Sequence, residues 1–117
     1  MLTQEDIPLC IPGYKHLQDV RSIIRFEGNG NYTLVHLSTH SRPLLVSQTL
    51  KRFEDKLAGF IRVSKSDLIN PNYVQKVIIK NTKVMHIQIT KGPRLLVSRR
   101  RMVETLARLD LSTESAD

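Results

Sequence analysis

The chain has 117 residues, of which 40% are apolar and 25% are charged, and its formal net charge is +7. This length suits a single domain with one hydrophobic core, and this composition argues against a disordered chain. The apolar runs are too short for a membrane-spanning helix, and the only cysteine, Cys10, leaves no internal disulfide. Because no secretory signal is visible either, we expect a soluble domain in a reducing, cytoplasmic compartment.

The positive charge is concentrated in the second half of the chain. Residues 61–108 contain eleven Lys or Arg and two acidic side chains, whereas residues 1–60 contain seven basic and six acidic ones. A segment this basic is attracted to polyanions, mainly nucleic acid or an anionic membrane surface. A solvated basic face without a partner explains the charge about equally well, so charge alone assigns no function.

The first half of the chain predicts an arm followed by short strands. Residues 1–22 contain Pro8, Pro12 and Gly13, which interrupt long elements, and we interpret them as an N-terminal arm that ends in a short strand or turn. Strands rich in β-branched and aromatic residues are then expected, with a Gly- and Asn-rich turn closing a hairpin. We place these strands at residues 22–26, 32–37 and 44–46 and the turn at residues 27–31.

An amphipathic helix is expected over residues 47–58. Ser47 or Thr49 can cap its start and Gly59 can end it. Its apolar side chains recur at helical spacing between charged ones and would pack on a sheet. They are Leu50, Phe53 and Leu57.

The second half predicts more strands and one final helix. The expected strands are residues 60–63, 68–70, 74–80, 84–90 and 94–97. The helix follows Ser98, and its expected apolar face consists of Met102, Val103, Leu106 and Leu109. Residues 111–117 form an acidic tail that we expect to be disordered. The whole pattern indicates a mainly β fold of small, mostly antiparallel sheets with one helix in mid-chain and one at the C-terminus.

The clearest functional signal is the arginine triplet 99–101 at the start of the final predicted helix. The helix dipole disfavours each base there by about 0.3–1 kcal/mol. Successive helical residues lie about 100° apart, so the three side chains cannot share one buried partner. Their charges and the free N–H groups would favour a bound anion such as a phosphate. The alternative interpretation is that the arginines are merely solvated.

Two other polar segments are weaker candidates. Residues 29–33 offer short donors and acceptors that can read base edges or hold phosphates, although Asn and Gly at a turn more often serve backbone geometry. Residues 64–66 place one lysine between two serines inside an apolar stretch.

The sequence does not support an enzyme or a metal site. Cys10 has no sequence context for a nucleophile, and the basic half holds only Asp67 and Glu104 as carboxylates, too few for paired acid–base catalysis. The histidines lack metal-ligand spacing. They are His16, His36, His40 and His86.

Three short motifs occur in order along the chain, and together they resemble the LytTR family of bacterial DNA-binding domains over residues 23–109. Residues 26–33 read Phe-Glu-Gly-Asn-Gly-Asn-Tyr-Thr, residues 60–70 read Phe-Ile-Arg-Val-Ser-Lys-Ser-Asp-Leu-Ile-Asn, and residues 97–100 read Val-Ser-Arg-Arg. Two positions depart from the family pattern. Ser64 stands where the family usually has His, and Asp67 stands where it usually has an aromatic residue.

The resemblance implies an elongated fold whose loops, rather than a recognition helix, enter successive major grooves of double-stranded DNA. It also implies two copies bound to a direct repeat, with bent DNA between them. Carried over by position, the base-edge contacts would come from Thr33, Lys65 and Arg100, where the arginine fork suits a guanine. The phosphate contacts would come from Asn31, Ser66, Ser98, Arg99 and Arg101. Asn70 is expected to be structural and to hold the turn before the following proline.

We therefore expect a DNA-binding domain over residues 23–110 that acts as a transcriptional regulator without a cofactor, a metal or a membrane partner. Residues 1–22 are too few for a receiver domain or a membrane segment, so we expect either a freestanding domain or an excised fragment, with a separate upstream signalling protein as a candidate partner. Because Asp67 could repel phosphate unless Arg62 or Lys65 neutralises it, a protein-interaction module that has lost DNA binding is the alternative. RNA binding is less favoured because the few aromatic residues form no stacking platform.

Overall fold

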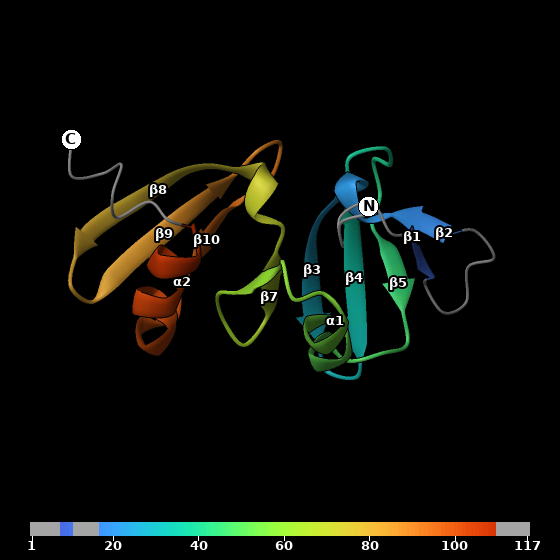
Figure 1. Ribbon diagram of the computed structural model, residues 1–117, viewed down its shortest axis with the longest axis horizontal. Coiled ribbons are helices and arrows are strands. Elements are labelled where there is room, and N and C mark those ends of the chain that lie inside the picture. The colour runs from blue at the N-terminus through green and yellow to red at the C-terminus, as the bar shows by residue number, and fades with distance from the viewer. Residues whose placement is uncertain (1–7, 11–16, 110–117) are drawn as a thin grey trace.

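The computed structural model describes residues 8–10 and 17–109, with side chains from residue 20 onward. Figure 1 shows three small sheets side by side along the longest axis, and the principal extents are 45 × 36 × 25 Å. Every strand pair is antiparallel. The expectation of an elongated, mainly β fold with one helix in mid-chain and one near the C-terminus is confirmed. The acidic tail 111–117 lies outside the described residues.

The strands follow the expected order. They are β1 (Pro8–Cys10), β2 (Leu17–Asp19), β3 (Ile23–Asn29), β4 (Tyr32–Leu37), β5 (Leu44–Val46), β6 (Ile61–Arg62), β7 (Asp67–Ile69), β8 (Val74–Asn81), β9 (Val84–Ile89) and β10 (Arg94–Leu96). The helices are α1 (Leu50–Lys56) and α2 (Met102–Leu109). Short 3-10 turns occupy Val20–Ser22, Pro71–Tyr73 and Arg99–Arg101. The sheets have the strand orders β1-β2, β5-β4-β3-β7-β6 and β10-β9-β8.

The first core lies between α1 and one face of the five-stranded sheet. The rings of Phe26 on β3 and Phe53 on α1 stack with their centroids 4.5 Å apart, and Phe60 lies 5.6 Å from Phe26. Leu68 on β7 is also fully buried in this cluster. The predicted apolar stripe of the first helix therefore packs on a sheet, as its spacing indicated.

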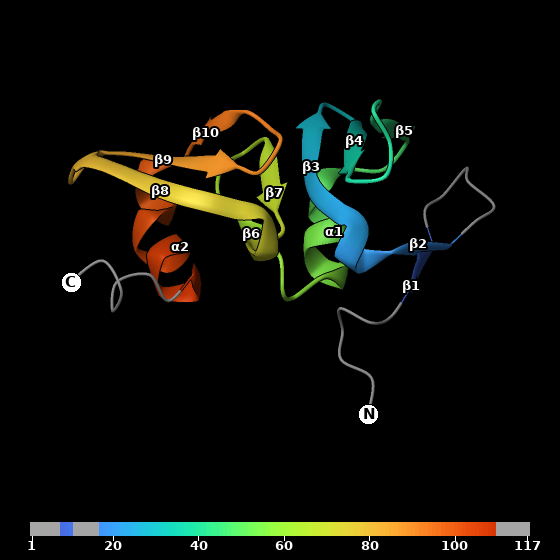
Figure 2. The same ribbon diagram turned by 90° about the horizontal axis from the view of Figure 1, so that it is seen from above.

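A second core lies between β6–β7 and the three-stranded sheet, where α2 covers it. Ile61 and Ile69 pack there with Met85, Ile87 and Met102. Because successive strand residues point to opposite faces, β7 places Leu68 in the first core and Ile69 in the second. The expectation of one core is wrong: the structure has two clusters, and both β7, through Leu68 and Ile69, and β3, through Ile23 and Ile24, contribute to each of them. Figure 2 shows α1 beside β3 and α2 below the three-stranded sheet in that view.

Both helices are shorter than the sequence suggested. The first begins after Thr49, whose side chain makes no cap hydrogen bond, and it ends at Lys56 rather than at Gly59. The Leu57 N–H still donates to the Phe53 carbonyl, so the last turn is closed from within the helix. The second α-helix begins only at Met102.

The face that α2 buries also differs from the expectation at one position. Val103 is 81% exposed, whereas Thr105 is fully buried. At about 100° per residue, positions 102, 105, 106 and 109 share one face of the helix, and position 103 falls outside it. The sequence prediction counted Val103 because it is apolar, but the geometry of the helix leaves it in solvent.

Adjacent positions on α2 should therefore respond differently to truncation. We expect Met102→Ala to lower the free energy of unfolding by about 2–5 kcal/mol, because it leaves a cavity in the second core. Val103→Ala should leave that free energy within about 0.5 kcal/mol of the parent value. Urea unfolding followed by circular dichroism measures both. Equal losses for the two variants would contradict the assigned helix face.

Candidate nucleic-acid interface

The tip of the β3–β4 hairpin is a tight two-residue turn. Asn29 pairs with Tyr32 across the hairpin, so Gly30 and Asn31 form the turn itself. Gly30 has φ +64°, a value that favours glycine, and it occupies the first central position as in a type II′ turn. Asn31 is exposed and Tyr32 is 49% exposed, so two polar side chains project at the tip.

Thr33 is the one expected base-edge residue that the structure places inside the protein. Its side chain is fully buried, and its hydroxyl donates to the Gln48 carbonyl at 2.6 Å. On β4 it is one of the alternate residues that face inward, together with Val35 and Leu37. A side chain without exposed surface cannot reach a base edge, so the expected role of Thr33 is corrected to that of a structural contact before α1.

The turn between β6 and β7 exposes Lys65 and Ser66. Its ends are closed by the Val63 N–H, which donates to the Asp67 carbonyl at 3.1 Å. The Arg62 guanidinium donates to the carbonyls of Ser64 and Lys65, both at 2.7 Å. This guanidinium also binds Glu54 of α1 at 2.7 Å, so the turn is fixed from behind. The carbonyl oxygens of Ser64 and Lys65, which could repel a polyanion, are thus bound by the Arg62 guanidinium, while Lys65 itself is exposed to solvent.

The arginine triplet adopts a 3-10 turn, Arg99–Arg101, directly before α2. Ser98 precedes it without a side-chain cap bond. A 3-10 turn spaces residues by about 120°, so the three side chains diverge more than they would in an α-helix. Arg99 and Arg100 are exposed and line a shallow hollow with Ser98. Arg100 also lines a second hollow with Arg101 and Glu104, so it lies centrally on this surface.

Within the described part of the chain, no hydrogen bond or ion pair engages the side chains of these three arginines. Three other arginines are paired: Arg25 with Asp67, Arg62 with Glu54, and Arg108 with the Ala58 carbonyl. Surface charge without an internal partner is available to an external anion. The expected anion contact of the arginines therefore stays a prediction, with Arg99 and Arg100 exposed and Arg101 half-buried.

Two backbone hydrogen bonds tie the hairpin, the β6–β7 turn and the arginine turn together. The Gly28 N–H donates to the Ser66 carbonyl at 2.7 Å, and the Ser98 N–H donates to the Val63 carbonyl at 2.8 Å. Gly28 also permits the close approach of α1, because a Cβ at this position would lie 3.3 Å from the Leu50 Cβ. The structure therefore brings together three segments that are far apart in the sequence.

A network of charged side chains lies behind the β6–β7 turn. The Arg25 guanidinium donates to Asp67 Oδ1 at 2.8 Å and lies 3.5 Å from Glu27 Oε1, which contacts His36 Nε2 at 3.0 Å. The Ser64 hydroxyl donates to Asp67 Oδ2 at 3.2 Å. The cation that pairs with Asp67 is thus Arg25 of β3, and not Arg62 or Lys65, the two candidates named from the sequence.

Burial raises the pKa of the Asp67 carboxyl above its usual value of 3.8. The charge of Arg25 and the hydrogen bond from Ser64 act in the opposite direction, and the nearby Glu27 adds to the rise. The side chain of Asp67 is only 15% exposed. The two departures from the family pattern, Ser64 and Asp67, therefore contact each other and form one local unit inside the turn.

Sequence reasoning missed the roles of Arg25 and Arg62. Arg25 lies between Ile24 and Phe26 in an apolar strand, and an arginine in such a place requires an acidic partner when it is buried. That signal could have pointed to Asp67. Asn70 was expected to be structural, and this is confirmed: its side chain donates to the Ile23 carbonyl and accepts from the Asn72 N–H.

Two other site classes receive no support from the described residues. No group of three or more His, Cys, Asp or Glu among them could hold a metal ion. In the same part of the chain, no helix has the length and apolar character needed to cross a membrane.

The raised pKa of Asp67 predicts how the stability difference from Asp67→Asn varies with pH. The native state binds the Asp67 proton more tightly than the unfolded chain does, so protonation of Asp67 stabilises the native state. This contribution to the free energy of unfolding is complete below pH 3.8 and is lost as pH rises through the raised native pKa. We expect the unfolding free energy of the parent minus that of Asp67→Asn to fall as pH rises in this window and then to level off. Urea unfolding between about pH 4 and pH 8 measures it. A difference that rises with pH there would show that the attraction of Arg25 outweighs burial.

The comparisons with known proteins agree with this geometry. The family model of the LytTr DNA-binding domain matches residues 15–110. One similar solved structure is the LytTr DNA-binding domain of a Bacillus cereus protein described as a methyl-accepting/DNA response regulator. It is 18% identical, the match covers 88% of this chain and 94% of that one, and the TM-score is 0.71. No curated protein matches the sequence. Because the family model spans most of the chain, the protein belongs to the LytTr DNA-binding domain family.

Proposed function

We propose that this domain regulates transcription by sequence-specific binding to double-stranded DNA, with the hairpin tip, the β6–β7 turn and the arginine turn entering the duplex surface together. The observation that carries this proposal is a pair of backbone hydrogen bonds, from the Gly28 N–H to the Ser66 carbonyl and from the Ser98 N–H to the Val63 carbonyl, which hold the three segments next to one another. Each segment presents exposed donors, and the arginines supply the charge that attracts phosphate.

The residue roles follow from exposure. Arg100 lies at the centre of the arginine surface and is assigned to a base edge, where its fork matches the O6 and N7 acceptors of guanine. Lys65 is assigned to a second base edge because it is exposed at the end of a turn fixed by Arg62. The phosphate contacts are assigned to Asn31, Ser66, Ser98, Arg99 and Arg101. Thr33 has no direct contact in this proposal.

The pairing of Asp67 removes the main reason for the alternative function. A free carboxylate in the β6–β7 turn would repel phosphate, but Asp67 is bound by Arg25 and Ser64 and is largely buried. The substitutions at positions 64 and 67 are therefore compatible with a nearby duplex. A protein-interaction module of the same fold remains the outcome that a failure of specific DNA binding would support.

The intact assembly would contain two copies on a direct repeat, with the DNA bent between the two bound sites. A shape of 45 × 36 × 25 Å allows one copy to follow successive grooves along one side of the duplex. We further propose that an upstream signalling protein controls this binding.

Selection of sites from a random duplex library tests the proposed function directly. We expect enriched sequences that contain direct repeats spaced by about 10 base pairs, which is one helical turn. Binding that is no tighter on any selected sequence than on random DNA, at physiological salt, would overturn the proposal and favour the protein-interaction module.

Substitutions of neighbouring arginines should separate base reading from phosphate binding. Arg100→Ala should cost about 1–3 kcal/mol of binding free energy and relax the preference at one base pair. Arg101→Ala should weaken all sequences alike and reduce the slope of log K against log salt by about 1. Fluorescence anisotropy over a salt series measures both effects.

The matched control is Lys83→Ala, which removes an exposed positive charge in the β8–β9 turn, away from the three segments. It should leave the preference for the selected site unchanged. If Arg100→Ala and Arg101→Ala both bind the best site as tightly as the parent does, the assignment of the arginine turn is wrong.

A further inference from the structure

Polar contacts fix the tip of the turn between β6 and β7, because Lys65 and Ser66 are exposed there and have little apolar packing. Arg62 binds the carbonyls of Ser64 and Lys65, and the Gly28 N–H donates to the Ser66 carbonyl at 2.7 Å. One further contact reaches the tip: the Ser66 N–H donates to the Ser64 hydroxyl oxygen at 3.2 Å. The Ser66 backbone is therefore held at its carbonyl and at its N–H, and the second contact depends on a side chain.

The contact at the Ser66 N–H is the outer end of a chain of hydrogen bonds that leads into the protein. The Ser64 hydroxyl donates to Asp67 Oδ2 at 3.2 Å, and Asp67 Oδ1 accepts from the Arg25 guanidinium at 2.8 Å. An ionised carboxylate has no proton to donate, so the Ser64 hydroxyl donates to it and keeps its lone pairs for the Ser66 N–H. Each hydrogen bond in such a chain polarises and strengthens the next. We refer to Arg25, Asp67 and Ser64 together as the relay.

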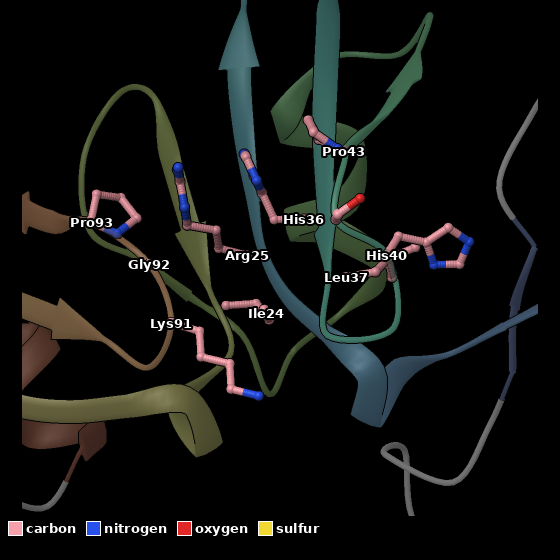
Figure 3. Close-up of a pocket in the computed structure, with 10 residues that line it drawn as sticks. Ile24, Arg25, His36, Leu37, His40, Pro43, Lys91, Gly92 and Pro93 are labelled. Carbon is pink, nitrogen blue, oxygen red and sulfur yellow. The ribbon is translucent and has the colours of Figure 1, made fainter.

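The inner end of the relay is fixed because Arg25 is buried and already paired. Its side chain is 8% exposed, and its Nη2 lies 3.5 Å from Glu27 Oε1, which contacts His36 Nε2 at 3.0 Å. Arg25 and His36 are cross-strand neighbours on β3 and β4, and Figure 3 shows their side chains next to each other at the wall of a pocket. With two carboxylates around it and so little exposed surface, Arg25 holds Asp67 and does not reach DNA.

We propose that the relay determines the base preference of the β6–β7 turn, because it fixes the Ser66 backbone and thereby the direction in which Lys65 approaches the duplex. Arg25, Asp67 and Ser64 are positioning residues, and none of them contacts DNA. The part of the proposal that concerns base preference rests on the proposed function, whereas the part that concerns the turn does not. The outer two members of the relay are the two positions at which this chain departs from the family pattern.

A looser turn costs selectivity before it costs affinity. The attraction between a lysine ammonium and the phosphates depends on charge and only weakly on direction, so a mobile Lys65 still contributes to it. A hydrogen bond to a base edge requires a donor–acceptor distance of about 2.7–3.2 Å and a narrow range of angles. Loss of the relay therefore lowers the preference at the base pair that Lys65 reads and leaves binding to random DNA unchanged.

Competition anisotropy with the selected DNA site and its single-base-pair variants tests the proposal. Lys65→Ala first identifies the base pair that Lys65 reads, as the position at which the preference relaxes. Ser64→Ala should lower the preference at this same base pair by about twofold to tenfold, the range for one net hydrogen bond. Its affinity for random DNA and its salt slope should equal those of the parent. An equal loss on every sequence, or an unchanged preference, would overturn the proposal.

Two further serine variants are matched to Ser64→Ala. Ser64→Thr retains the hydroxyl and should retain the preference of the parent. Ser41→Ala removes a hydroxyl from an exposed residue beyond the end of β4 that lies opposite the hairpin tip, and it should also bind like the parent. If Ser64→Thr is as unselective as Ser64→Ala, the hydroxyl does not position the turn and the relay is wrong.

Asp67→Asn tests the inner half of the relay with a side chain of the same size. An amide has one oxygen acceptor in place of two, so it cannot accept from both Arg25 and Ser64 in this geometry, and the preference should relax at the same base pair. The double variant Ser64→Ala/Lys65→Ala should be as selective as Lys65→Ala alone, because no Lys65 side chain is left to position. Additive losses would show that Ser64 acts on DNA directly and would contradict the positioning role.

Amide exchange followed by NMR in the free protein tests the relay without DNA. In Ser64→Ala the Ser66 N–H should exchange with solvent about threefold faster or more, because its protecting hydrogen bond is lost. The Val63 N–H, which donates to the Asp67 carbonyl, should exchange at the rate of the parent. Unchanged Ser66 exchange would overturn the relay itself. If Lys65→Ala relaxes no base pair, the proposed role of Lys65 fails together with the base-preference part, and the exchange rates still decide the relay.

Discussion

The arrangement of the proposed interface depends on the β6–β7 turn, because this turn is hydrogen-bonded to the other two segments through its backbone. The Ser66 carbonyl accepts from Gly28 of the hairpin, and the Val63 carbonyl accepts from Ser98 at the arginine turn. Backbone hydrogen bonds do not depend on the identity of the side chains. The turn can therefore carry Ser64 and Asp67, which are unusual for the family, and still hold the three segments in the same relation.

The same turn is supported from below by the two cores. Strand β7 sends Leu68 into the core beneath α1 and Ile69 into the core beneath α2, and both side chains are fully buried. A second connection runs from Arg108 on α2 to the Ala58 carbonyl in the segment after α1. Because the halves meet at β6 and β7, a change in their relative position acts directly on the turn between these strands.

Most of the fold could be predicted from local sequence patterns. The Gly30 turn, the β8–β9 hairpin and the apolar stripe of α1 are each specified by residues close together in the chain. The burial of Thr33 could not be predicted, because strand alternation shows that one face is buried without showing which residue closes against the segment before α1. The exposure of Val103, in contrast, could be predicted, because the 100° spacing of α-helical residues places it outside the face that positions 102, 106 and 109 share.

The sequence predicts which cationic residues form the candidate site, but it does not predict which acidic side chains pair with the arginines behind it. The arginine triplet and Lys65 are visible in the sequence as cations in a segment, residues 61–108, that contains eleven basic and only two acidic side chains. The pairing of Arg25 with Asp67 joins residues 42 positions apart; the apolar neighbours of Arg25 indicate that it needs an acidic partner, but the local sequence does not place Asp67 beside it. The same holds for the contact of Arg62 with Glu54, which is formed only after α1 has packed against the sheet.

The central claim is that the hairpin tip, the β6–β7 turn and the arginine turn contact one duplex at the same time. Amide NMR during a titration with the selected DNA site tests it most directly, with Asn31, Lys65 and Arg99 as reporters of the three segments. The account predicts that all three resonances shift along one binding curve with a common dissociation constant. Shifts confined to one segment, or curves with different midpoints, would contradict it.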